Sequence, residues 1–444
     1  MAVVLPFKGL LYHPEKIGRI ESVVSPPYDV IPPEKQIELH ERHPNNVVRL
    51  ILGRTFETDS AGDNPHTRSA AYFRSWIKEG VLVQDGSPAF YLTSVTFRAD
   101  GKTITRYGLM AIVGLEPFKN GVILPHEQTF SKVKSERLEL LKQCKANFSP
   151  IFTFYADEEK RLIQLFEECA TQTSPIFDLE DDVQERHRLY RISDPKRMEQ
   201  ITALMKDKRL FIADGHHRYE TALNYRDWLR ETDPEFSERH PANFMMMYIC
   251  SMEDPGLVIF PTHRMVTRVD ASVAGQFLEK ASEFFDIRSI PFNGQGKAAA
   301  FDAMMGELKQ RQDQTLFGVA RKEAETFDLL YLRDGIVERI FGDAIPPLLA
   351  HLDVTILTHL IFARLLAISQ DRLDDQGLIK YSSRADQAVD QVGSGQADMA
   401  FIMNPAKIRQ VQDIAQAGLI MPRKTTYFYP KALTGLVMND LTLS

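Results

Sequence analysis

The order of hydrophobic and polar positions along the chain predicts a mixed α/β protein. Apolar residues crowd two stretches, 89–97 and 103–115, on either side of turn residues 99–102, which is typical of a β-hairpin. Further strands are expected over residues 149–155, 209–213, 244–250, 257–260, 327–332 and 400–403. Apolar positions three or four residues apart predict helices over 68–78, 158–169, 196–205 and 218–230, and one that begins at Ser135. Because no internal repeat is present, we expect an α+β (mixed α/β) fold.

The length of the chain favours more than one packed unit. A chain of 444 residues exceeds the usual size of one hydrophobic core. The acidic connection from Asp178 to Glu185 is the best candidate for a boundary. We therefore expect an N-terminal α+β region over residues 1–177 and a second region over residues 178–444.

The composition of the chain indicates its cellular compartment and the class of partner that it binds. Residues 1–8 lack the features of a secretion signal, and the apolar stretch 352–368 is interrupted by charged and polar residues, so no membrane span is expected. The three cysteines, Cys144, Cys169 and Cys250, form no CxxC pattern, which favours a reducing cytoplasm. The net charge of −7 disfavours nucleic acid as a partner but allows a local basic pocket for a small anion.

The strongest chemical signal lies between the strand at 210–213 and the following helix. Unpaired amides at a helix N-terminus favour anions, Gly215 permits close approach of a ligand, and His217 and Arg218 add donors that match phosphate oxygens. Asp214 could cap the helix or hold a phosphate-bound Mg²⁺. The plainer alternative is that the two histidines are partly buried polar residues at a helix start.

This motif carries a resemblance to known phosphate-binding proteins. Residues 214–222 read DGHHRYETA and are similar to the phosphate-binding signature of the ParB and sulfiredoxin superfamily, which implies a core of that type. The form is most like that of ADP-dependent free serine kinases, which implies an ATP or ADP phosphate at His217 and Arg218 and transfer to a small hydroxyl compound. Sulfiredoxins have cysteine at the position of His216, so their chemistry on sulfur is not expected.

Several further motifs are spread over the whole chain. They are PYDV (27–30), HEQT (126–129), Ser149-Pro150, the 214–218 loop, THR (262–264) and MPRKTTYFYPK (421–431). Through these motifs the chain resembles the bacterial family called domain of unknown function 1015. The resemblance implies no settled activity, but the family's likeness to free serine kinases and its suspected link with phosphoserine metabolism imply serine or phosphoserine as the small-molecule partner.

A second cluster of candidate residues precedes the helix expected at Ser135. Glu127 could accept the proton of an alcohol while His126 orients it or shuttles the proton, and His216 completes the predicted catalytic set. Lys132 and Arg137 could neutralise phosphate or a substrate carboxylate. The alternatives are an ordinary loop carboxylate beside a histidine, and two exposed basic residues at a helix start.

The remaining candidates lie far apart along the sequence. His263 and Arg264 follow an expected strand and could form a second clamp on the cofactor phosphates, or a structural salt bridge. The segment 423–431 has little periodicity and is expected to be a shaped loop, a lid or a tethering patch, with Lys424 directed at the cofactor and Lys431 at the substrate.

The N-terminal part adds one more candidate, and the histidine pattern argues against zinc. Asp29, in a proline-rich loop, could contact an amino group of the substrate or a metal. No HxxxH or HExxH pattern and no cysteine ligand pair is present, so a structural zinc site is not expected.

These observations lead to one functional prediction with two alternatives. We expect a nucleotide-dependent small-molecule phosphotransferase that uses Mg²⁺ and activates its acceptor through Glu127. A phosphohydrolase resembling a phosphoserine phosphatase is the enzymatic alternative. A non-catalytic, nucleotide-responsive binding module is the other.

Overall fold

The computed structural model describes residues 1–99, 101–129, 131–293, 296–369, 372–373, 375 and 377–442, except for the side chains of residues 131 and 132. The chain forms two compact units. Unit 1 contains Met1–Val258 and Phe428–Ser444, and unit 2 is the intervening segment Ile259–Tyr427. Unit 2 is thus inserted into the sequence of unit 1.

Unit 1 contains most of the strands that are described. They are β1 (Val4–Leu5), β2 (Leu10–Tyr12), β3 (Leu82–Gln84), β4 (Phe90–Ala99), β5 (Lys102–Gly114), β6 (Ile123–Leu124), β7 (Ala146–Asn147), β8 (Ile151–Tyr155), β9 (Phe177–Glu180), β10 (Arg186–Ile192), β11 (Leu210–Asp214), β12 (Phe244–Ser251) and β21 (Asn439–Asp440). Its helices and 3-10 turns are α1 (Pro14–Ile17), η1 (Ile20–Ser22), η2 (Tyr28–Val30), α2 (Pro33–Arg42), α3 (Val48–Ile51), α4 (Pro65–Lys78), η3 (Phe118–Asn120), α5 (Ser131–Cys144), α6 (Arg161–Gln172), α7 (Pro195–Met205), α8 (His216–Thr232) and η4 (Pro241–Asn243).

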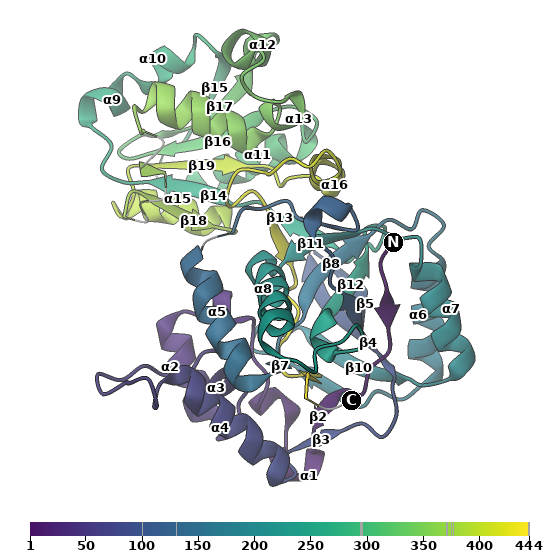
Figure 1. The fold of residues 1–444 in the computed structure, drawn as a ribbon. Helices are drawn as coiled ribbons and strands as arrows, with labels where there is room; N and C mark the ends of the chain where they lie inside the picture. Colours follow the sequence, from purple (N-terminus) through teal and green to yellow (C-terminus); the bar gives the residue numbers. More distant parts are fainter. Residues whose placement is uncertain are drawn as a thin grey trace. The chain divides into compact units, whose positions relative to one another are not determined.

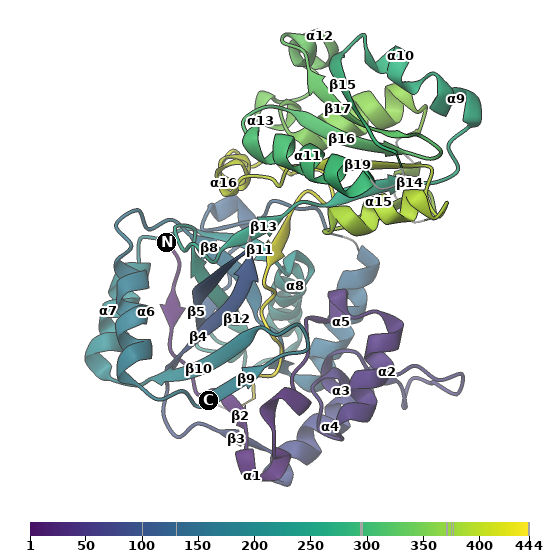
Figure 2. The ribbon, with the colours of Figure 1, turned by 180° about the vertical axis from the view of Figure 1, so that it is seen from behind.

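A nine-stranded mixed sheet forms the centre of unit 1. Its order is β6-β11-β8-β12-β5-β4-β10-β9, and β1 pairs with β5 outside this path. Helices α6 and α7 lie together on one side of these strands, and α5 and α8 lie on the opposite side (Figures 1 and 2). The largely apolar strands β8, β11 and β12 are adjacent in the sheet, as expected for strands that are covered by other elements.

The sequence pattern explains these elements well. The expected hairpin is present: β4 and β5 pair antiparallel from Tyr91 with Met110 to Ala99 with Lys102. The amphipathic helix α6 buries Leu162, Leu165 and Phe166 in the main core. Burial of such side chains is worth about 1.5–3 kcal/mol each, which makes this face of the sheet a principal source of stability.

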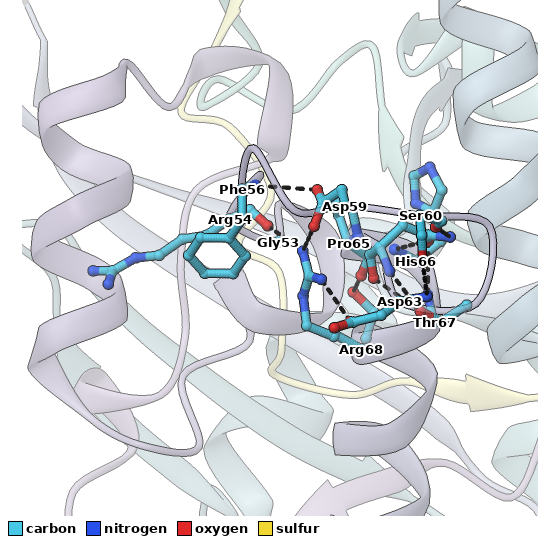
Figure 3. A network of polar contacts seen from close by, with 12 residues as sticks. Gly53, Arg54, Phe56, Asp59, Ser60, Asp63, Pro65, His66, Thr67 and Arg68 are labelled. Carbon is cyan, nitrogen blue, oxygen red and sulfur yellow. Dashed lines mark hydrogen bonds and ion pairs between the residues drawn. The ribbon is translucent and has the colours of Figure 1, made fainter.

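The segment before α4 is fixed to the start of that helix by polar contacts (Figure 3). Asn64 accepts hydrogen bonds from two backbone amides of the first turn, and the Thr67 hydroxyl accepts one from the backbone N–H of Asn64 at 2.9 Å. This reciprocal arrangement is a capping box. Arg68 also contacts the carboxylates of Asp59 at 2.8 Å and Asp63 at 2.7 Å, which joins the preceding loop to the helix.

Unit 2 is a second α/β layer structure with its own core. Its six-stranded sheet has the order β15-β17-β16-β19-β14-β18. Its strands are β14 (His263–Val266), β15 (Phe285–Pro291), β16 (Leu316–Arg321), β17 (Thr326–Leu332), β18 (Ile379–Ser382) and β19 (Met399–Met403). Its helices are α9 (Ala271–Gly275), α10 (Phe277–Ala281), α11 (Lys297–Gln310), α12 (Ile336–Phe341), α13 (Pro347–Ala350), α14 (Asp353–Ile356), the π-helical segment η6 (Leu357–Leu365), α15 (Ala385–Gly393) and α16 (Ile408–Gln416). Strands β13 (Val258–Phe260) and β20 (Tyr427–Tyr429) lie where the chain passes between the units.

The mixed α/β class expected from the sequence is confirmed, but two boundaries differ. The division expected between residues 177 and 178 falls inside unit 1, because the acidic connection there is the turn of the β9–β10 hairpin, and β10 pairs with β4 in the main sheet. Helix α5 begins at Ser131, four residues before the N-cap expected at Ser135. Among the described residues, no helix has the length and apolar character needed to cross a membrane.

Candidate functional site

The turn between β11 and α8 has the geometry expected of an anion-binding helix start. Gly215 has φ 94° and ψ 27°, in the left-handed region that favours glycine, and helix α8 begins at the next residue. The first amides of a helix have no acceptor within it, so this turn presents backbone N–H groups. The glycine serves a second purpose: a Cβ at this position would lie 3.0 Å from guanidinium atoms of Arg218. The space expected to admit a ligand is therefore filled by the Arg218 side chain.

Two cations meet at the carboxylate of Asp214. Lys431 Nζ lies 2.7 Å from Oδ1, and Arg218 Nη2 lies 2.7 Å from Oδ2. Desolvation alone would raise the pKa of Asp214, but the two cations outweigh it and hold this pKa at about 2. The three side chains are mostly buried, with 14%, 15% and 10% of the Asp214, Lys431 and Arg218 side chains exposed. Asp214 thus fixes two positive groups beside the α8 N-terminus.

Arg218 also faces a pocket of unit 1. A second guanidinium nitrogen, Nη1, donates to the carbonyl of Pro150. The residues that line the pocket include Tyr28, Arg137, Arg218 and Thr221, together with a mainly apolar wall. The Oγ1 atom of Thr221 is buried and has no hydrogen-bond partner among the described residues. Arg218 is therefore paired with a carboxylate and still borders a cavity.

Glu127 lies between two buried histidines. Its two carboxylate oxygens lie 3.8 Å from His126 Nε2 and 3.8 Å from His216 Nδ1. The imidazole rings of these histidines are almost fully buried, and 35% of the Glu127 side chain is exposed. The ring centroids of the histidines are 4.7 Å apart, at an interplanar angle of 83°. The structure thus brings the three predicted catalytic residues together.

Backbone contacts determine which ring nitrogens carry a proton. His126 Nδ1 lies 2.8 Å from the carbonyl of Ile212, which can only accept, so Nδ1 is the protonated atom and Nε2 presents a lone pair towards Glu127. His216 Nε2 accepts from the backbone N–H of His126 at 3.3 Å, so Nδ1–H faces Glu127. Burial lowers the pKa of His126 to about 4 and that of His216 well below its usual range, so both rings are neutral near pH 7.

The other predicted residues of unit 1 surround this centre. Asp29 lies on η2 and is exposed as a whole residue, but protein atoms surround its carboxyl group. This desolvation is the main cause that raises the pKa of Asp29, and the negative charge of Asp214 is the second. Arg137 is buried, donates to the carbonyl of Ile51 at 2.7 Å and lies 4.2 Å from the ring centroid of Tyr28. The side chain of Lys132 lies outside the described part of the structure.

His217 and the three predicted residues of unit 2 have different surroundings. His217 is the second residue of α8 and is partly exposed. In unit 2, His263 Nδ1 accepts from the backbone N–H of Met403 at 3.3 Å, and Arg264 donates to the carbonyls of Thr262 and Lys424, the latter at 2.8 Å. Burial lowers the pKa of Arg264 to about 10. These contacts hold the 263–264 pair within unit 2, and its role as a cofactor clamp stays a prediction.

A residue that the sequence patterns did not reveal anchors the segment ahead of Lys431. Arg106 of β5 is fully buried. Its guanidinium donates to the carbonyls of Tyr429 at 3.0 Å and Pro430 at 2.7 Å, and to the hydroxyl of Tyr248 at 2.9 Å. It also lies 4.8 Å from the ring centroid of Phe152. The only available signal was an arginine within a largely apolar strand, where an unpaired charge would be costly.

One known protein family matches most of this chain. A family model described as a protein of unknown function (DUF1015) matches residues 4–355. The chain belongs to the DUF1015 family. This membership confirms the resemblance based on the motifs. The match covers the first segment of unit 1 from residue 4 to Val258 and continues into unit 2 as far as residue 355. A search of curated proteins found no match to this DUF1015 chain.

Several solved structures are similar to this DUF1015 chain. A free serine kinase in complex with ADP is 13% identical, with a TM-score of 0.33, and the match covers 72% of this chain and 87% of that one. A conserved hypothetical protein from Pyrococcus furiosus is 13% identical, with a TM-score of 0.33, and the match covers 75% and 96%. A truncated SbnI from Staphylococcus aureus is 10% identical, with a TM-score of 0.32, and the match covers 73% and 85%. At these TM-scores no functional conclusion is drawn from the similarity.

Proposed function

We propose that this DUF1015 protein is a nucleotide-dependent phosphotransferase that acts on a small hydroxyl compound, with serine as the first candidate. The observation that carries the proposal is the convergence of Arg218 and Lys431 on Asp214 at the N-terminus of α8. Two fixed cations and a row of helix amides form an arrangement suited to phosphoryl oxygens. The resemblance of residues 214–222 to the free serine kinase motif supports a nucleotide as the ligand.

The proposed chemical step uses Glu127 as the general base. The acceptor hydroxyl would give its proton to the Glu127 carboxylate as its oxygen forms a bond to phosphorus, while the bond from phosphorus to the nucleotide oxygen breaks. His216 Nδ1–H lies 3.8 Å from the carboxylate and would orient it on closer approach, and the lone pair of His126 Nε2, also at 3.8 Å, would take the proton onward. The exposed part of Glu127 allows an acceptor to reach it.

Asp214 fits a positioning role better than a metal-binding role. Mg²⁺ was expected at this residue, but each of its oxygens is hydrogen-bonded to a cation at 2.7 Å. A metal ion there would have to displace Lys431 or Arg218. We therefore assign Asp214 to holding these two side chains and not to binding a metal ion. The neighbouring Asp29, whose pKa is raised, is proposed to face the amino group of the acceptor.

The proposal is tested with pure protein, labelled ATP or ADP, and L-serine. Labelled phosphoserine is the expected product, and the reverse assay should consume phosphoserine when the nucleotide product is supplied. Absence of turnover in both directions, with every nucleotide and acceptor tried, would remove the phosphotransferase function. Release of inorganic phosphate from phosphoserine without nucleotide would instead identify a phosphohydrolase, because the partly exposed Glu127 could activate water in place of a hydroxyl compound. Nucleotide binding without turnover would identify a binding module.

A further inference from the structure

A second group of ionisable side chains lies in the β9–β10 hairpin of unit 1, apart from the residues assigned to phosphate. Asp181, Glu185 and His187 each offer one donor atom, and these atoms all lie within 4.8 Å of one another. His187 Nε2 is 3.2 Å from Asp181 Oδ2 and 3.8 Å from Glu185 Oε2. The proposal that follows does not depend on the function proposed above.

The hairpin turn orients these donors. Asp181 Oδ1 accepts hydrogen bonds from the backbone N–H groups of Val183 at 3.0 Å and Glu185 at 2.9 Å, which leaves Oδ2 directed at His187. Backbone bonds also close the turn, from Asp181 N–H to the Glu185 carbonyl at 3.0 Å and from Gln184 N–H to the Asp181 carbonyl at 3.0 Å. The donor set is thus held by main-chain contacts before any ion binds.

Glu185 is the independent sign that this cluster can bind a cation. The residue is 5% exposed, and its Oε1 atom has no hydrogen-bond partner among the described residues. Burial raises its pKa, although a hydrogen bond from Tyr429 opposes the shift. A buried carboxylate oxygen without a partner is unfavourable, and a bound cation would remove that penalty.

We propose that Asp181, Glu185 and His187 bind a divalent cation of the Zn²⁺ class. One imidazole nitrogen and two carboxylate oxygens are ligands of this class, whereas Mg²⁺ and Ca²⁺ prefer oxygen alone. Ligands about 2.0–2.2 Å from a tetrahedral ion lie roughly 3.3–3.6 Å apart. The distances of 3.2 Å and 3.8 Å from His187 Nε2 are close to this range, and a donor pair at the limit of 4.8 Å would have to close by about 1.5 Å at most. The sequence did not predict this site because its ligands include one histidine and two carboxylates, without a histidine pair or a cysteine pair.

A cation can reach this cluster from solvent, and its binding would affect a neighbouring segment of the chain. Asp181 lines a pocket together with Asp182, and 18% of its side chain is exposed, so an ion and its waters can reach the cluster. Glu185 accepts a hydrogen bond from Tyr429, which lies two residues before Lys431. A cation at Glu185 would therefore stiffen the hairpin and the chain segment that brings Lys431 to Asp214.

The test measures Zn²⁺ binding to the full-length chain after treatment with a chelator. Titration calorimetry and elemental analysis should give one ion per chain, and Co²⁺ should produce visible absorption typical of nitrogen and oxygen ligands. The variants Asp181→Asn, Glu185→Gln and His187→Gln should each weaken Zn²⁺ binding at least about tenfold, as loss of a metal ligand does. The matched control is Asp182→Asn, because this neighbouring carboxylate pairs with Lys35 and Arg42 and lies outside the donor set.

Several outcomes would overturn the proposal, and folding is checked separately. Circular dichroism of each variant without metal identifies any that fail to fold, and the remaining variants decide the question. Failure of the parent chain to take up Zn²⁺ or Co²⁺ would mean that His187 serves only as a partner of two carboxylates. Zn²⁺ uptake that is equal in the parent and in all folded cluster variants would place the ion elsewhere. Neither outcome depends on nucleotide, so it would leave the phosphotransferase proposal standing.

Discussion

Nζ of Lys431 lies 2.7 Å from Oδ1 of Asp214, although 217 positions separate the two residues in the sequence. The contact is made because the chain returns to unit 1 after the whole of unit 2. Arg106 fixes the returning segment by donating to the carbonyls of Tyr429 and Pro430. The candidate anion site is therefore assembled from three distant parts of the sequence, and each part can be tested by substitution.

The first prediction concerns the guanidinium at the start of α8. Arg218→Ala should weaken phosphate or nucleotide binding by about 1.5–3 kcal/mol, because hydrogen bonds to charged groups are lost. Calorimetric titration with ADP or ATP measures the change. The control Arg230→Ala removes an exposed arginine of the same helix that pairs with Asp227 and should leave affinity unchanged. Equal affinity of the parent chain and Arg218→Ala would place the anion site elsewhere.

The second prediction separates binding from chemistry. Glu127→Gln keeps the size of the side chain but cannot accept a proton, so kcat should fall by about 10² to 10⁴ while nucleotide affinity stays close to that of the parent chain. Initial rates of phosphoserine formation and a parallel binding titration give both values. The variant Glu139→Gln alters an exposed carboxylate on α5 that pairs with Lys142 and lies outside the predicted site, so it serves as the control. Full activity of Glu127→Gln would exclude this residue as the base.

The third prediction addresses the anchor beneath the returning segment. Arg106→Met should lower the free energy of unfolding by about 2–4 kcal/mol, because the buried carbonyl of Pro430 and the partly buried carbonyl of Tyr429 lose their donors. Nucleotide affinity of the folded variant should fall as well, since the position of Lys431 is no longer fixed. Denaturant unfolding and binding titration measure the two effects. The exposed Arg98 of the adjoining strand β4 offers the control Arg98→Met, which should change neither.

The fourth prediction is a pH dependence of stability. The pKa of His126 is about 4 in the folded chain, against about 6.5 when unfolded. Between these values the unfolded state binds a proton that the folded state does not, so stability falls as the pH drops from 6.5 to 4, by about 3 kcal/mol for this one residue. Above pH 6.5 the contribution is constant.

The variant His126→Gln isolates that contribution. Denaturant unfolding between pH 7.5 and 4 should show a smaller loss of stability in the variant than in the parent chain. His216 and His263, whose pKa values are also lowered by burial, contribute to the slope that remains. Burial lowers the pKa of His40, His43, His66 and His359 as well, so these residues add to it. Identical slopes in the two proteins would mean that His126 is not buried in its neutral form.

Local patterns predicted the elements better than their boundaries and assembly. The hairpin of β4 and β5 and the strand and helix around Gly215 follow from apolar periodicity and turn residues, so they were found. The start of α5 was placed four residues late because Ser135 resembles an N-cap while the helix continues upstream to Ser131. The acidic run from Asp178 to Glu185 suggested a linker, but its charges lie on a hairpin that is held in the sheet by strand pairing.

In the candidate site, too, the sequence predicted individual residues better than the contacts between them. Residue types identified His126, Glu127 and Asp214, because buried histidine and carboxylate are costly without a purpose. No local pattern reveals that Asp214 is paired with Lys431, since that contact depends on how unit 2 interrupts unit 1. The expectation that Gly215 admits a ligand was too simple, because its missing Cβ makes room for Arg218.

The insertion of unit 2 has a consequence for biosynthesis. A ribosome produces Asp214 and Arg218 long before Lys431, with all of unit 2 in between. While the chain is still being made, the paired oxygen of Asp214 lacks its lysine, and the Arg106 guanidinium lacks two of its carbonyl acceptors. The two-cation arrangement at Asp214 therefore forms only after Lys431 has left the ribosome, so the proposed anion site would be completed at the end of synthesis.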